Sequence, residues 1–118
     1  MPTVLICDDS LFARHMTRRM LNGAFEVVGE AEDGEDAVAR YRELHPDVLL
    51  IDLVMPRLSG TEAIQRIMAE FPDARIVVCS AMGQDQLVAE ARAAGARGFV
   101  VKPAKPDELS AALGAVLA

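Results

Sequence analysis

The chain has 118 residues, of which 52% are hydrophobic, and it carries a formal net charge of −6. This length and apolar content are typical of one domain with a single core, and the acidic balance argues against a nucleic-acid surface, which needs a clustered basic face. The sequence has no apolar stretch of 18 residues, and its first apolar run begins almost at the amino terminus. We therefore expect neither a membrane span nor a signal peptide, but a cytoplasmic protein.

Strand and helix signals alternate five times along the chain. Short β-branched runs separated by helical stretches are typical of buried parallel strands. The predicted strands cover about residues 3–7, 25–31, 48–51, 75–79 and 98–101. The predicted helices cover about residues 11–22, 35–44, 61–71, 84–94 and 107–117. This order predicts one α/β domain over residues 1–118, a doubly wound five-stranded parallel sheet of order 2-1-3-4-5 with helices on both faces.

The first and last predicted helices carry signals for their ends and faces. Asp9 or Ser10 is the expected N-cap of the first helix, and Asp107 that of the last. In the first helix, apolar residues recur every four positions, which predicts that they face the sheet: Phe12, Met16 and Met20. The basic residues of this helix are expected on its outer face: Arg14, His15, Arg18 and Arg19.

Cys7 and Cys79 end two predicted strands that a third strand separates. Two strand spacings would place their Cα atoms about 10 Å apart, whereas a disulfide requires less than about 7 Å. The sequence has no CxxC motif or Cys/His cluster. We therefore expect both cysteines to be small core residues rather than disulfide partners or zinc ligands.

Four predicted strands run into polar groups that phosphate chemistry can use. Asp8 and Asp9 follow the first strand, Asp52 the third, Ser80 the fourth and Lys102 the fifth. In an open parallel α/β sheet, ligands bind just beyond the carboxyl ends of the strands. We therefore expect these five residues to converge on one rim of the sheet, although they are far apart in the sequence.

Three carboxylates on one rim require a cation or raised pKa values, because two unit charges 4 Å apart repel by roughly 4 kcal/mol at an effective dielectric of 20. Hard oxygen ligands with open positions suit Mg²⁺, beside which an exposed carboxylate can attack a phosphoryl group. Lys102 could then neutralise phosphate oxygens and Ser80 could donate to one of them. Taken singly, each of these residues is as readily a helix cap, a turn residue or a solvated side chain.

This spaced set resembles the receiver domains of bacterial two-component signalling, and the resemblance extends from Val4 to Val116. It implies that Asp52 is the phosphoacceptor. It also implies a Mg²⁺ site made by Asp8, Asp9, Asp52 and the backbone carbonyl of Val54. Catalysis and phosphate binding would fall to three further residues, Ser80, Ala81 and Lys102.

The same resemblance implies a switch and a cis peptide bond before Pro103. Phosphorylation would draw Ser80 towards the new group, and Phe99 would turn inward and repack the surface of the fourth helix, fifth strand and last helix. Ala104 is a departure, because many relatives carry an aromatic residue there. Val54 and Met82 fall where family members border the hydrolytic water, and neither side chain can orient it by hydrogen bonding. We therefore predict slow self-dephosphorylation.

Within the family, residues 9–14 and 79–84 are most similar to stand-alone chemotaxis receivers. This similarity implies a monomeric signalling protein rather than an enzyme. A histidine kinase would phosphorylate it, the phosphorylated form would signal to a flagellar motor switch protein, and a phosphatase could remove the phosphoryl group. No nucleic-acid or membrane partner is expected. A phosphorelay intermediate and a receiver fragment of a larger regulator remain alternatives, and the basic face of the first helix is either solvated or a docking surface for the kinase.

Two alternatives come from other classes of protein. A Mg²⁺-dependent phosphatase could use Asp52 as its nucleophile, but Val54 occupies the place where haloacid dehalogenase-type phosphatases need a second acid. A flavodoxin-like flavin carrier would share the strand order. Its phosphate loop, however, would lie at Asp8 and Asp9, which repel phosphate in the absence of a metal.

Overall fold

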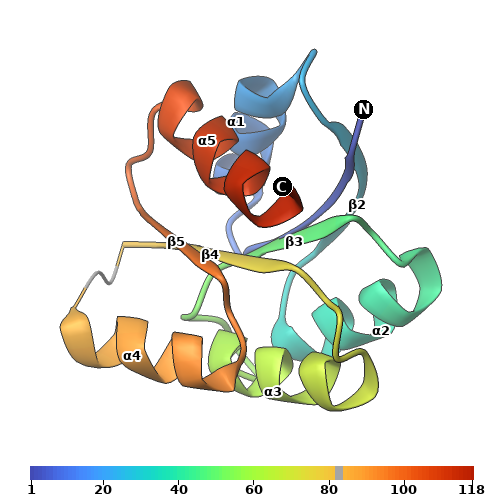
Figure 1. Cartoon of the computed structure of the whole chain (residues 1–118), viewed down its shortest axis with the longest axis vertical. Helices are drawn as coiled ribbons and strands as arrows, with labels where there is room; N and C mark the ends of the chain where they lie inside the picture. The colour runs from blue at the N-terminus through green and yellow to red at the C-terminus, as the bar shows by residue number, and fades with distance from the viewer. Residues whose placement is uncertain (82–83) are drawn as a thin grey trace.

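Figure 1 shows a computed structural model of the chain, in which a central parallel sheet separates two layers of helices; it describes residues 1–81 and 84–118. The strands are β1 (Thr3–Cys7), β2 (Glu26–Ala31), β3 (Val48–Ile51), β4 (Ile76–Ser80) and β5 (Gly98–Val101). The helices are α1 (Leu11–Leu21), α2 (Gly34–Leu44), α3 (Gly60–Glu70), α4 (Asp85–Ala94) and α5 (Pro106–Leu117). None of the helices in this described part is long and apolar enough to cross a membrane.

The strand order is β2-β1-β3-β4-β5 and all neighbouring pairs are parallel, which confirms the predicted fold and places β2 at an edge. Cys7 pairs with Ile51 across β1 and β3, and Ser80 pairs with Val101 across β4 and β5. The carboxyl ends of β1 and β3 are therefore level, as are those of β4 and β5, and β4 runs two residues past its Val78–Ile51 pair with β3. This register brings the residues that follow each strand to one rim of the sheet.

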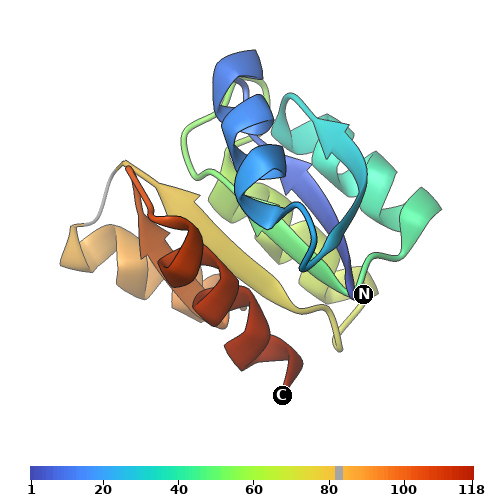
Figure 2. The ribbon, with the colours of Figure 1, turned by 90° about the horizontal axis from the view of Figure 1, so that it is seen from above.

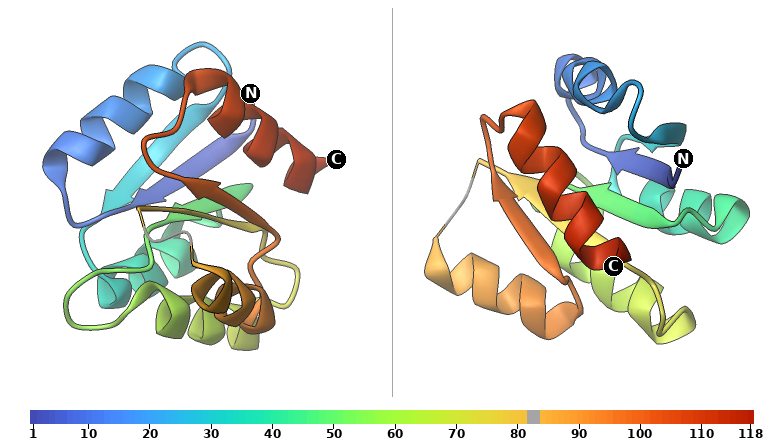
Figure 3. Two further views of the ribbon diagram at one scale, coloured as in Figure 1. Left: turned by 90° about the vertical axis from the view of Figure 1, so that its left-hand side faces the viewer. Right: turned by 45° about the horizontal axis from the view of Figure 1, so that its top comes forward.

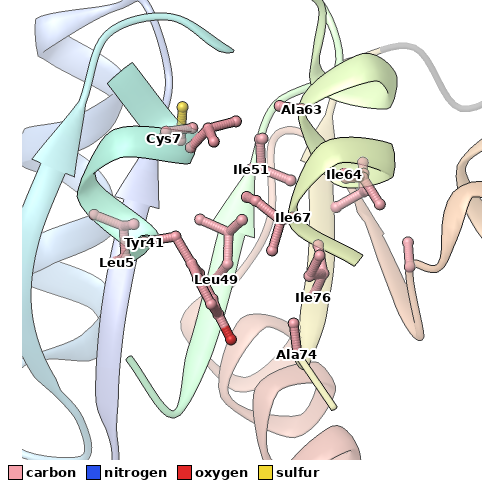
Figure 4. Packing of buried hydrophobic residues seen from close by; sticks show 14 of the residues in the cluster. Leu5, Cys7, Tyr41, Leu49, Ile51, Ala63, Ile64, Ile67, Ala74 and Ile76 are labelled. Carbon is pink, nitrogen blue, oxygen red and sulfur yellow. The ribbon is translucent and has the colours of Figure 1, made fainter. Parts of the chain in front are cut away.

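Each face of the sheet has its own apolar core. α1 and α5 cover one face, and α2, α3 and α4 cover the other (Figures 1, 2 and 3). Alternate strand residues point to opposite faces, so the strands are buried on both sides. Figure 4 shows the core beneath α2 and α3, where side chains of β1, β3 and β4 meet Tyr41, Ile64 and Ile67.

The two cysteines lie in different cores. Cys7 belongs to the core under α2 and α3, and Cys79 belongs to the core under α1 and α5. Both are buried free thiols. The expectation that they are core residues without a disulfide is confirmed.

The face of α1 that packs on the sheet differs from the predicted one. Phe12 and Met16 are 74% and 40% exposed, whereas Arg14 is only 8% exposed. The predicted inward face was therefore wrong for Phe12 and Met16, and the outward placement was wrong for Arg14. A buried polar group is tolerated when its hydrogen bonds are satisfied. The Arg14 guanidinium donates to the Glu30 carboxylate on β2 and to the backbone carbonyl of Asp8, which follows β1.

The caps explain where the helices begin. The Ser10 hydroxyl accepts a hydrogen bond from the backbone N–H of Ala13 at 3.1 Å, as expected for α1. The prediction that Asp107 caps α5 was wrong, since this helix begins one residue earlier, at Pro106. Proline at the first helical position needs no N–H partner there. Asp107 instead lies in the first turn, where its charge faces the positive end of the helix dipole.

Candidate functional site

Side chains that follow β1, β3 and β5 meet at one rim of the sheet. Lys102 Nζ donates to Asp52 Oδ2 at 3.0 Å, and it also donates to Asp8 Oδ2. One carboxylate oxygen each from Asp8, Asp9 and Asp52 lies within 4.8 Å of the other two. The structure thus brings together the acidic side chains and the lysine as predicted, while their chemical roles stay predictions.

The three carboxylates differ in their contact with solvent. Asp8 is only 6% exposed, Asp52 is half-buried and Asp9 is exposed. Burial raises the free energy of a charged carboxylate unless a cation or hydrogen bond compensates for it. Lys102 supplies one such cation, and the three carboxylate oxygens are close enough together to hold a metal ion as a second.

The donor chemistry of this cluster fits Mg²⁺. Carboxylate oxygens are hard ligands, and a set of three leaves coordination positions for water and for a phosphoryl oxygen. Val54, whose carbonyl is the further predicted ligand, is close to the site, since its backbone N–H donates to Asp52 Oδ1 at 3.2 Å. The residue is 60% exposed.

Lys102 is held as a cation by its surroundings. Partial burial alone would lower the pKa of Lys102, but hydrogen bonds to Asp8 and Asp52 together with their charges raise it above its ordinary value. A protonated amine beside Asp52 can stabilise negative charge on an incoming phosphoryl group. The peptide bond between Lys102 and Pro103 is cis, as the resemblance implied.

The loop from Leu53 to Ser59 is fixed from two sides. The Gly60 N–H donates to the Leu53 carbonyl at 3.0 Å, which folds the loop back to the start of α3. Arg57, with a φ of 66°, pairs with Asp33 at 3.3 Å between Nε and Oδ2. The position of Asp52 at the start of this loop is therefore set by contacts to α3 and to the N-cap of α2.

Ser80 and Phe99 lie on one face of the sheet. Val78 pairs with Phe99 across β4 and β5, and both pack on the core under α2, α3 and α4. Ser80 follows Val78 by two residues, so its side chain points to the same face. Ser80 is 1% exposed, and its carbonyl accepts from the Lys102 N–H at 2.9 Å. Ala81 is exposed, and Met82 lies outside the described residues.

Arg14, which was expected on the outer face of α1, contacts the site instead. Its Nη1 donates to the backbone carbonyl of Asp8 at 2.7 Å, and its Nε donates to Glu30 Oε1 at 2.8 Å. Both partners lie outside α1. Nothing in the local sequence of α1 separates Arg14 from Arg18, because only the tertiary partners make one of them an inward residue.

The chain is similar in sequence to known proteins over most of its length. Residues 4–114 match the family model of the response regulator receiver domain. The chemotaxis protein CheY of Thermotoga maritima is 47% identical over 96% of this chain and 95% of the relative. CheY of Listeria monocytogenes is 44% identical over 93% of each chain.

Solved structures give the same result. A complex of CheX, CheY, BeF₃ and Mg²⁺ from Borrelia burgdorferi contains a chain of the same fold, with a TM-score of 0.94 and 31% identity over 98% of this chain and 89% of that one. The response regulator domain of Thermotoga maritima CheB has a TM-score of 0.92 and 32% identity over 99% of this chain and 96% of that one.

Proposed function

From the premise that this chain belongs to the family of response regulator receiver domains, we propose that it is a chemotaxis response regulator that accepts a phosphoryl group on Asp52 from a histidine kinase. The observation that carries the proposal is the contact of the Asp52 carboxylate with Lys102 inside the acidic cluster. The chemotaxis assignment rests on relatives that are CheY proteins and that align over 93% or more of both lengths. Residues 1–118 would form one receiver domain.

The reaction follows from the groups present at the rim. An Asp52 oxygen attacks the phosphorus of a phosphohistidine, the P–N bond breaks as the P–O bond forms, and the histidine leaves as a neutral imidazole after protonation. Asp8, Asp9, Asp52 and the Val54 carbonyl would hold Mg²⁺, which would neutralise phosphoryl oxygens when bound. Lys102 would pair with a phosphoryl oxygen, and Ser80 and Ala81 would donate to others.

The response would begin at Ser80. A phosphoryl group adds about two negative charges and strong hydrogen-bond acceptors, and Ser80 lies at the end of β4, where its hydroxyl could move towards it. Phe99 is on the same face of the sheet and is partly buried, so it could turn inward and change the surface of α4, β5 and α5. To change the ratio of the switched to the unswitched conformation from 1:99 to 99:1, phosphorylation must favour the switched conformation by roughly 5.5 kcal/mol. A few charge-assisted hydrogen bonds could supply this difference.

We propose three kinds of partner for this cycle. A histidine kinase would donate the phosphoryl group, a flagellar motor switch protein would bind the phosphorylated form, and a phosphatase would reset it. The solved complex of CheY with CheX supports a receiver surface that binds a second protein. A binding assay with the motor switch protein, before and after phosphorylation, separates a chemotaxis regulator from a phosphorelay intermediate.

The class of reaction can be tested with a small phosphodonor. We expect acetyl phosphate with Mg²⁺ to add one phosphoryl group to the wild-type chain, measured by intact mass, and to add none to Asp52→Asn or to the wild type in EDTA. Asp47→Asn, which changes an aspartate beyond the opposite end of the sheet, is the control. Turnover of p-nitrophenyl phosphate would favour the phosphatase alternative, and no covalent gain from acetyl phosphate would refute the proposal.

A further inference from the structure

Arg14 is a buried cation next to the proposed metal ligands. Its side chain is 10% exposed, and the residue lies on the inner face of α1 with Thr17 and Leu21. A buried charge is destabilising unless it is paired and hydrogen-bonded. An apolar residue would fill the same place under α1 without that penalty, so the partners of Arg14 indicate what the charge is used for.

One partner of Arg14 is the peptide group that joins Asp8 to Asp9. Pairing of β1 with β3 ends at Cys7, so the Asp8 carbonyl lies beyond the sheet ladder, where Arg14 Nη1 donates to it at 2.7 Å. The peptide group is planar. The direction of this carbonyl therefore also sets the direction in which the chain continues to Asp9.

Asp8 is held by three other contacts. Its N–H donates to the Ala31 carbonyl at 3.0 Å, its Oδ1 accepts from the Ser10 N–H at 2.9 Å, and its Oδ2 accepts from Lys102. With the carbonyl bound by Arg14, both the backbone and the side chain of Asp8 are fixed. The contact that orients the link to Asp9 is the one made by Arg14.

The other partner of Arg14 is Glu30 on the edge strand β2. Glu30 accepts from Arg14 Nε through one oxygen at 2.8 Å and from Arg18 through the other. The side chain of Arg18 is 44% exposed, and among the described residues its hydrogen bond is to Glu30 and not to Asp8. Glu30 thus holds the guanidinium of Arg14 in the orientation that reaches Asp8.

We propose that Arg14 is a positioning residue for Mg²⁺ binding, which sets the relative placement of Asp8 and Asp9 through their shared peptide group; this inference rests on the proposed function of the site. Groups that orient metal ligands without touching the metal contribute roughly 10- to 100-fold to metal affinity. A cation near a metal site also repels the metal. Loss of positioning and loss of repulsion therefore change the affinity in opposite directions.

The test compares the Mg²⁺ affinity of Arg14→Met with that of Arg18→Met, measured by calorimetric titration at fixed ionic strength. Each variant removes one cation that binds Glu30, but of these two arginines it is Arg14 that also donates to the Asp8 carbonyl. We expect Arg14→Met to bind Mg²⁺ about 10- to 100-fold more weakly than the wild type, and Arg18→Met to bind it equally or slightly more tightly. Affinity of Arg14→Met equal to or above that of the wild type would overturn the proposal, as would an equal loss in Arg18→Met.

Lysine variants keep the test decisive if Arg14→Met does not fold. Arg14→Lys retains the charge but cannot span Asp8 and Glu30 with the fork of a guanidinium, so it should bind Mg²⁺ more weakly than Arg18→Lys. Equal affinities of the two lysine variants would overturn the proposal. Thermal unfolding in EDTA shows which variants are folded.

Failure of this inference can be told apart from failure of the proposed function. If the wild type and Arg18→Met neither bind Mg²⁺ nor gain a phosphoryl group from acetyl phosphate, the function assigned to the site is wrong. If both do so and the Arg14 variants behave in the same way, the function stands and only the role of Arg14 is wrong.

Discussion

Gly60, the first residue of α3, lies directly against the backbone of Asp52. A Cβ atom at Gly60 would overlap the Asp52 carbonyl oxygen and would lie 2.6 Å from Leu53 Cα. No side chain fits between these two backbones. The start of α3 therefore limits where the chain can run after Asp52, and with it where the carboxylate lies.

Gly60→Ala should displace the loop that begins at Asp52. We expect the free energy of unfolding to fall by about 1–3 kcal/mol, because the overlap is with backbone atoms that a rotamer change cannot relieve, and phosphorylation by acetyl phosphate to slow. Urea unfolding and intact mass measure the two effects. Gly114→Ala is the control, since a Cβ there meets no atom within 4 Å and should stabilise α5 by up to about 1 kcal/mol. Equal stabilities of Gly60→Ala and wild type would contradict the packing argument.

Lys102→Met should make the protein more dependent on Mg²⁺. The variant loses the amine that contacts Asp8 and Asp52, so a bound divalent ion relieves more carboxylate repulsion than in the wild type. Each tenfold gain in affinity adds about 1.4 kcal/mol of stabilisation at saturating Mg²⁺. We expect Mg²⁺ to raise the melting temperature of Lys102→Met more than that of the wild type. Lys105→Met removes an exposed lysine as the control, and the same increment in all three proteins would refute the expectation.

Val54→Asn should shorten the lifetime of the phosphorylated form. Val54 is 60% exposed beside Asp52 and its side chain cannot hold the water that attacks an acyl phosphate, whereas an amide can donate and accept hydrogen bonds. We expect decay of the phosphoprotein, followed by intact mass, to become several-fold faster. Met16→Gln, a polar change at an exposed position of α1, is the control. An unchanged lifetime would mean that Val54 does not border the water.

Glu30 should couple stability to acidic pH. Burial raises the pKa of Glu30, but hydrogen bonds from Arg18 and Arg14 outweigh it and hold the pKa below its ordinary value of 4.5. A carboxylate whose pKa is lower in the folded chain than in the unfolded chain stabilises the folded state when the pH is above the unfolded-state pKa. This stabilisation is lost as the pH falls through the folded-state pKa. The stability difference between wild type and Glu30→Gln should therefore be constant above about pH 5 and shrink below it.

Urea unfolding between pH 6 and pH 3 in EDTA measures this difference for Glu30. Glu43→Gln removes an equal charge from an exposed position and corrects for the change in total charge. A stability difference that stays constant down to pH 3 would show that Glu30 has the same pKa in the folded and the unfolded chain.

The two cysteines should resist thiol reagents in the folded protein. Burial raises the pKa of Cys79 from 9.0 to about 11, while burial and neighbouring carboxylates raise the pKa of Cys7 further. A rise of two units lowers the reactive thiolate fraction about 100-fold, and burial blocks access as well. We expect no modification by iodoacetamide at pH 8 until urea unfolds the chain, and then two modified cysteines by mass. Rapid labelling of the native protein would contradict the burial of both thiols.

The sheet order and the meeting of distant side chains could be predicted from the sequence. Buried parallel strands give continuous apolar runs, and the carboxyl ends of such strands share one rim. Asp8 and Asp52 therefore had to be neighbours if the strand order was right, whereas Lys102, which follows β5 on the far side of β4, meets them through its long side chain. The structure places them together because Cys7 pairs with Ile51 and the β5 strand ends in step with β4.

The rotation of α1 could not be predicted in this way. The spacing of Phe12 and Met16 indicates an inward apolar face, but both are exposed and Arg14 is buried. The partners that draw Arg14 inward, Glu30 and the Asp8 carbonyl, belong to other segments. Local periodicity contains no information on such tertiary hydrogen bonds.

The separation of Asp8 and Lys102 by 94 positions means that the charge balance of the acidic cluster is completed late in synthesis. A nascent chain still attached to the ribosome would have its aspartates long before β5 emerges and pairs with β4. It would lack the lysine contact until then, so the carboxylates of Asp8 and Asp52 would have only solvent ions to balance their charge.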